Sequence, residues 1–97
     1  MTRRFVCIFT RGAQWQTGKP VFEQALGPHV EYMKGLKRAG TLLAAGPFLD
    51  DRGGLAIVSA ASLEQAHEIF GQDPAVATQV FAAEVHPWQA LHPKEFA

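Results

Sequence analysis

The sequence has no excess of charge of either sign. Its 97 residues include nine Lys and Arg and nine Asp and Glu, so the formal net charge is zero. A protein whose main task is nucleic-acid binding needs a basic surface that neutralises phosphates, and the charge balance argues against that task. No stretch approaches the ~20 apolar residues of a membrane-spanning helix. We therefore expect neither nucleic acid nor a membrane as a partner.

Cysteine is nearly absent as well, because Cys7 is the only one. It cannot form an intrachain disulfide, and one unpaired thiol is typical of a protein of the reducing cytoplasm. Within "FVCIF" we expect a small buried hydrophobic residue there and not a nucleophile. The opening "MTRRFVCIFT" contains an apolar run too short for a signal peptide, so we interpret it as a strand of a cytoplasmic protein.

What the sequence does contain is a regular alternation of strand and helix patterns. Aromatic and β-branched residues predict strands over 3–11, 41–49, 55–60 and 78–88. The second of these is expected to bend or end at Gly46 and Pro47, and the last to end at Pro87. Helices are predicted over 62–71 and over 21–39, or only 28–39 if "GP" interrupts the first one. Residues 12–20 and 50–54 are loops, and 89–97 is a polar tail.

The element order β-α-β-β-α-β predicts an α+β domain of the ferredoxin-like type over residues 1–97. Its four-stranded antiparallel sheet would carry both helices on one face. The segments "VCIF" and "VFAAEV" are apolar on both faces of a strand, so the second sheet face also needs cover. We expect a second copy of the chain to supply it, which gives a two-fold homodimer.

One histidine lies at an unexpected place in the predicted first helix. His29 falls in the middle of the apolar stripe with Tyr32 and Met33, while Glu31 and Lys34 are expected on the opposite face. It is either a core histidine satisfied by a backbone carbonyl, or a general base or acid at the mouth of a pocket. The sequence alone leaves both interpretations open.

An aspartate after the second helix offers a partner for this histidine. Asp73 follows the helix end in "GQDPAV", where Asp-Pro is also an ordinary turn or cap. We expect the two helices to run roughly the same way. The start of the first helix would then lie far from Asp73, unless the chain folds back after it or a second copy intervenes. No histidine pair has zinc-helix spacing, and no glycine pattern fits a dinucleotide or phosphate loop, so we expect neither metal nor cofactor.

Four separated motifs together resemble one protein family. They are H-x-x-Y in "HVEYM", G-P in "AAGPF", D-P in "GQDPAV" and P-W in "EVHPW". In this order they resemble the YCII-related (YciI-like) family, over nearly the whole chain from Phe5 to Trp88. The resemblance implies a dimeric α+β barrel built from ferredoxin-like protomers. Two departures concern specificity: His86 stands where members often carry arginine before P-W, and the loop over 12–20 is longer than a minimal version.

The resemblance also implies a chemistry. In the family the histidine and the aspartate of D-P are regarded as a catalytic dyad, which here corresponds to His29 and Asp73. One relative dehydrochlorinates a chlorinated hydroxyhydroquinone, and the superfamily includes muconolactone isomerases and cofactor-free monooxygenases. We therefore expect proton transfer, isomerisation or elimination on a small cyclic or aromatic-derived molecule. The residues expected to contact the substrate are Tyr32, Gly46, Pro47, Phe48 and Trp88. The alternatives are a non-catalytic binding or sensor dimer, and a structural dimer in which His29 is a satisfied core group.

Overall fold

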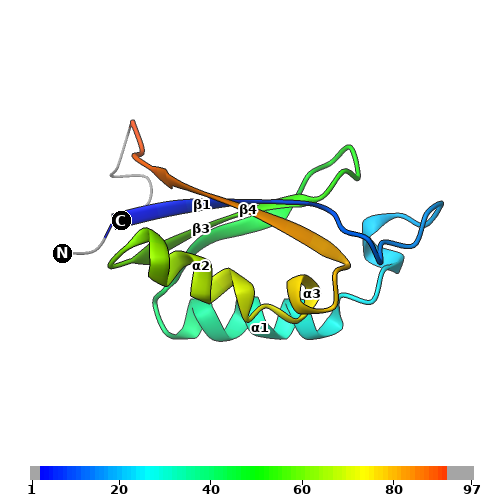
Figure 1. Cartoon of the computed structure of the whole chain (residues 1–97), viewed down its shortest axis with the longest axis horizontal. Helices are drawn as coiled ribbons and strands as arrows, with labels where there is room; N and C mark the ends of the chain where they lie inside the picture. Colours follow the sequence, from blue (N-terminus) through cyan, green and yellow to red (C-terminus); the bar gives the residue numbers. More distant parts are fainter. Residues whose placement is uncertain (1–2, 92–97) are drawn as a thin grey trace.

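A computed structural model describes residues 3–91 of the chain, and they form one sheet with helices on one side (Figure 1). The four strands are β1 (Arg3–Arg11), β2 (Leu42–Pro47), β3 (Gly54–Ala60) and β4 (Phe81–Trp88). They lie in the order β2-β3-β1-β4, and each neighbouring pair is antiparallel. This arrangement confirms the α+β, ferredoxin-like protomer that the element order predicts.

The helices are α1 (Gly27–Arg38), α2 (Leu63–Gly71) and the short α3 (Pro74–Ala77), with a 3-10 turn η1 (Val21–Glu23) before α1. The shorter prediction for the first helix is therefore close to the observed one, and the longer one is wrong. The reason lies in Gln24, whose buried side chain bonds the backbone of Gln16 and Lys19 and holds residues 21–26 against the preceding loop. Helix α3 lies in a segment for which the sequence pattern predicted no helix.

The expected direction of the helices is also wrong. Strands β1 and β3 are antiparallel neighbours, and each one is followed by its own helix. Helices α1 and α2 therefore run in opposite directions across the same sheet face (Figure 1). As a consequence the start of α1 lies beside the end of α2, and the chain after α2 needs no partner subunit to bring it near His29.

The core fills the space between the sheet and the helices. Phe5, Cys7 and Phe9 alternate along β1 toward the helices and are almost fully buried, and they meet Ala66 and Phe70 of α2. The prediction that Cys7 is a small buried residue is confirmed, since it is 0% exposed.

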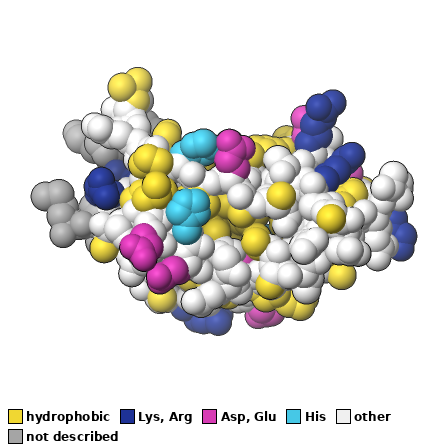
Figure 2. All heavy atoms as spheres, in the orientation of Figure 1, with side chains coloured by type: hydrophobic (Ala, Val, Ile, Leu, Met, Phe, Trp, Pro, Cys, Tyr) yellow, Lys and Arg dark blue, Asp and Glu magenta, His cyan; other side chains and the backbone are white. Residues whose placement is uncertain are grey.

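The other sheet face has no cover within residues 3–91. Val6 and Ile8 of β1 point to this face, and the register sets them opposite Ile57 and Leu55 of β3. Figure 2 shows the molecule with the sheet edge-on, as in Figure 1; on this view the Lys and Arg side chains are scattered around the periphery and apolar side chains lie between them. Among the described residues, no helix has the length and apolar character to cross a membrane.

Candidate functional site

Asp73 is held in a fixed position at the junction of α2 and α3. Its backbone is extended at the N-cap of α3, and its Oδ1 accepts a hydrogen bond of 3.0 Å from the Ala75 amide. Pro74 follows at the first helical position, where a missing N–H costs nothing. The side chain is 0% exposed, so the carboxylate needs partners for both of its oxygens.

His29 supplies the second partner from the first turn of α1. Its Nδ1 lies 2.6 Å from Oδ2 of Asp73, and the imidazole is 16% exposed. The rings of Phe9 and Phe81 meet the imidazole edge-on, with centroids at 5.3 and 5.4 Å. These contacts fix both the position and the orientation of the imidazole.

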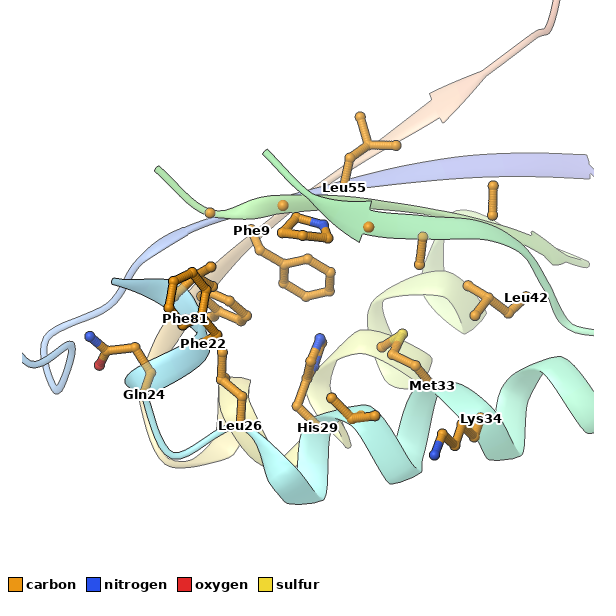
Figure 3. Close-up of a pocket in the computed structure, with 18 of the residues that line it drawn as sticks. Phe9, Phe22, Gln24, Leu26, His29, Met33, Lys34, Leu42, Leu55 and Phe81 are labelled. Carbon is orange, nitrogen blue, oxygen red and sulfur yellow. The ribbon is translucent and has the colours of Figure 1, made fainter. Parts of the chain in front are cut away.

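The contact with Asp73 also indicates which ring nitrogen of His29 carries the hydrogen. A carboxylate oxygen can only accept, so Nδ1–H donates to Asp73 and leaves Nε2 of a neutral ring as an acceptor. Within residues 3–91 no hydrogen bond of Nε2 is formed, and His29 is part of a cavity wall. Figure 3 shows the ring directed from α1 toward Phe9. An acceptor nitrogen is thus presented to whatever occupies the cavity.

The cavity lies between α1 and β2 and has a volume of about 690 Å³. It is mostly apolar, and Phe9, Leu26, Met33, Leu42 and Phe81 contribute to its wall (Figure 3). Such a space fits a small organic molecule with an apolar body and few polar groups.

The structure brings some of the other predicted site residues to this cavity and not others. Gly46 and Pro47 line it together with His29, whereas Phe48 does not. Tyr32 lies on the far side of α1, where its hydroxyl donates a 2.6 Å hydrogen bond to the carbonyl oxygen of Ile69. Trp88 borders a separate hollow near Arg3 and Arg4.

Sequence reasoning missed several members of the wall. Phe9 and Phe81 surround the imidazole, and the alternation of β1 already contained the signal for Phe9, since it shares a face with Cys7. Lys34, expected on the opposite helix face, lines the cavity together with Lys37. The 3-10 turn η1, which carries Phe22, forms another part of the cavity wall, and no sequence pattern predicted this turn.

Two ionisable side chains near His29 and Asp73, those of Tyr32 and Cys7, have raised pKa values. Burial, and then the nearby charge of Asp73, raise the pKa of Tyr32 above its ordinary value, so its phenol stays protonated and donates to Ile69. Burial is the main cause that raises the pKa of Cys7 to about 12, which makes the thiol a poor nucleophile. In the part of the chain described, no three His, Cys, Asp or Glu side chains gather as metal ligands.

Comparisons with known proteins agree with the fold of the chain. A solved structure of 5-chloro-2-hydroxyhydroquinone dehydrochlorinase from Burkholderia phenoliruptrix, in complex with 2,5-dihydroxybenzoquinone, is similar with a TM-score of 0.66. The two proteins are 22% identical, and the match covers 96% of this chain and 99% of the other. No curated protein matches in sequence. The family model of the YCII-related domain matches residues 4–89, and the chain therefore belongs to the YCII-related family.

Proposed function

We propose that the protein is a small, cofactor-independent enzyme that moves a proton in the isomerisation or elimination of a small cyclic or aromatic-derived molecule. The observation that carries the proposal is the 2.6 Å contact of His29 with Asp73 at the wall of an apolar cavity. His29 acts as the general base or acid, and Asp73 is a positioning residue that holds its tautomer.

The proposed step uses only groups of this chain and the substrate. In an elimination, Nε2 of His29 accepts a proton from the substrate, and the electron pair of that bond forms a new double bond. The leaving group departs with the electron pair of its own bond, and Asp73 stabilises the imidazolium. In an isomerisation the imidazolium returns the proton at another atom. Neither reaction needs an oxidant or a reductant.

Substrate contacts are proposed for the residues that share the cavity with His29. Gly46 and Pro47 belong to its wall on the side of β2. Gly46 has no side chain, and a Cβ atom there would meet nothing within 4 Å, so a bound molecule can approach the backbone. Tyr32, Phe48 and Trp88 do not line the cavity, and we leave them out of the proposed contact surface.

We propose that the working form is a cytoplasmic homodimer. The apolar rows of the open sheet face support the dimer: Val6 lies beside Ile57, and Ile8 beside Leu55. These four side chains form an apolar patch that is bordered on β4 by Glu84 and His86. An exposed apolar patch is unfavourable in water and is commonly covered by a second copy. The free, buried Cys7 is compatible with a reducing compartment.

The test is turnover of a chlorinated hydroquinone. The structural neighbour is named for 5-chloro-2-hydroxyhydroquinone, so this compound is the first substrate to assay, with chloride release as the readout. We expect His29→Gln to reduce the rate by about 10²-fold or more, the usual contribution of a general base. The matched control is His67→Gln, because His67 is exposed on α2 and does not line the cavity.

Two outcomes contradict the proposal. One is a rate that survives His29→Gln unchanged. The other is binding of the compound with no turnover of it or of related quinols and lactones, which would favour a non-catalytic binding dimer.

A further inference from the structure

The cavity beside His29 carries charge of one sign only. Apart from His29, its wall includes two ionisable side chains, Lys34 and Lys37, and both are cationic at neutral pH. Among the described residues, no Asp or Glu lines the cavity. Asp73 lies behind the imidazole, fully buried, and does not face the space.

The helix geometry aligns these cations with the proposed general base. Successive residues turn by about 100°, so His29, Met33 and Lys37 are displaced by only about 40° from one to the next and follow one side of α1. Lys34 lies further round, at the flank of this stripe. Long side chains on a helix tilt toward its N-terminus, so a lysine at position 37 can reach back over Met33 toward the space beside His29. Figure 3 shows His29, Met33 and Lys34 in succession along this stretch of α1.

The two lysines differ in how far their charge is already compensated. Lys34 approaches Glu31 at 3.6 Å, and both side chains are more than half exposed, so this pair is weak. Lys37 forms no ion pair with any residue in 3–91. Its charge is thus available to a molecule in the cavity.

A cation beside an apolar cavity selects for a particular kind of ligand. A neutral apolar molecule gains nothing from an ammonium group, and a cation would be repelled. An anion with an apolar body can bury that body against Met33 and Leu42 and still pair its charge with a lysine.

We infer that the cavity binds small organic anions, and that Lys37 is the residue that determines this specificity, with Lys34 in a secondary role. The inference rests on the proposed function in taking this cavity as the substrate site. It adds the class of substrate: a ring or short apolar body with a carboxylate, phenolate or enolate group that reaches Lys37, while its reacting proton lies at Nε2 of His29.

The experiment compares two probes of almost equal shape, benzoate and benzamide, which differ in charge. Binding is measured by NMR titration of the His29 ring signals in the full-length protein. We expect benzoate to bind at least about tenfold more tightly than benzamide, because the neutral amide cannot form an ion pair with a lysine. The preference should shrink when the salt concentration is raised, because salt screens partly exposed charges.

Two variants test whether Lys37 is the source of the preference for benzoate. Lys37→Gln is expected to lower the affinity for benzoate by about tenfold and to leave benzamide unchanged. Arg38→Gln is the matched control: it removes the same charge from the same last turn of α1, at a position that does not line the cavity. It should leave both affinities unchanged.

The inference is overturned if benzamide binds as tightly as benzoate, if benzoate fails to shift the His29 signals, or if Arg38→Gln weakens benzoate as much as Lys37→Gln. These results do not depend on catalysis. Charge-selective binding without any turnover would leave this inference intact and contradict the proposed function. Turnover that needs His29 but shows no charge preference would support the proposed function and contradict this inference.

Discussion

Nδ1 of His29 lies 2.6 Å from Oδ2 of Asp73, although 44 residues separate the two in sequence. The contact exists because α1 begins where α2 ends, and because the N-cap bond of Asp73 to the Ala75 amide holds the carboxylate toward α1. One oxygen of the carboxylate is thus used by the fold and the other by the imidazole. Because the two oxygens of Asp73 have different partners, substitutions of Asp73 should affect activity and stability separately.

The consequence for activity is that the two residues should act as a unit. Asp73→Asn is expected to lower turnover by about 10²- to 10⁴-fold, because the amide no longer holds the imidazole with Nε2 as acceptor. In a His29→Gln background the same change should have little further effect. The measurement is a double-mutant cycle on the rate of chloride release.

A matched control is available for this cycle. Asp50→Asn makes the same chemical change at an exposed position of the β2–β3 turn, with the side chain 65% exposed, and should leave the rate unchanged. Additive effects of the His29 and Asp73 substitutions would contradict the coupling.

The consequence for stability separates the two oxygens of Asp73. Asp73→Asn keeps an oxygen that can accept from the Ala75 amide, whereas Asp73→Ala removes the cap and leaves a buried space. We expect Asp73→Ala to be less stable than Asp73→Asn by about 1–2 kcal/mol, the usual value of an N-cap. Urea unfolding of both variants gives this difference, and equal stabilities would show that the cap bond contributes nothing.

Much of the fold could be predicted from the sequence because its signals are local. The alternation along β1, the Ser62 cap that accepts from the Gln65 amide, and Pro28 in the first turn of α1 each follow from a few neighbouring residues. Strand bounds differed by a few residues, as for β4, which begins at Phe81 and not at residue 78. Most of the expected polar tail lies outside the described residues.

The site was less accessible to sequence reasoning because it depends on the relative direction of two helices. Each of His29 and Asp73 stood out alone. Their proximity follows from the place of β1 beside β3 in the antiparallel sheet, and no local pattern encodes this strand order. The cavity wall depends on Gln24, whose three hydrogen bonds to the backbone hold the turn before α1. Such long-range contacts leave no periodic signature.

The turn between β2 and β3 should tolerate no side chain at Gly53. Its φ is +139°, and a Cβ atom there would collide with the carbonyl oxygen of Phe9, a residue of the cavity wall. Gly53→Ala is therefore expected to lower the free energy of unfolding by at least about 2 kcal/mol. Gly71→Ala is the control: it meets nothing within 4 Å at the end of α2 and should be neutral or slightly stabilising. Urea denaturation of the two variants makes the comparison, and similar losses in both would contradict it.

Alkaline pH should destabilise the protein through Cys7. Its pKa is raised by burial from 9.0 to about 12, so between these values the unfolded chain loses a proton that the folded chain keeps. The unfolded state then binds fewer protons, and stability falls as the pH rises from about 9 toward about 12. Cys7→Ala should show a smaller loss over this range in urea unfolding at a series of pH values, and an identical pH dependence would contradict the assignment to Cys7.

The open sheet face gives a prediction about assembly. The register sets Ile8 between Leu55 and Glu84 on this face. A glutamate in place of Ile8 would therefore bring a second carboxylate beside Glu84, at the edge of the apolar patch. If a second copy covers the face, Ile8→Glu buries repelling charges in the interface and the dimer should dissociate, because unpaired buried charge is strongly unfavourable. Leu63→Glu makes the same change at a partly exposed position on α2, 38% exposed, and should leave the dimer intact. Sedimentation velocity decides between the outcomes: a native chain that is monomeric, or an Ile8→Glu variant that stays dimeric, means that this face is not the interface.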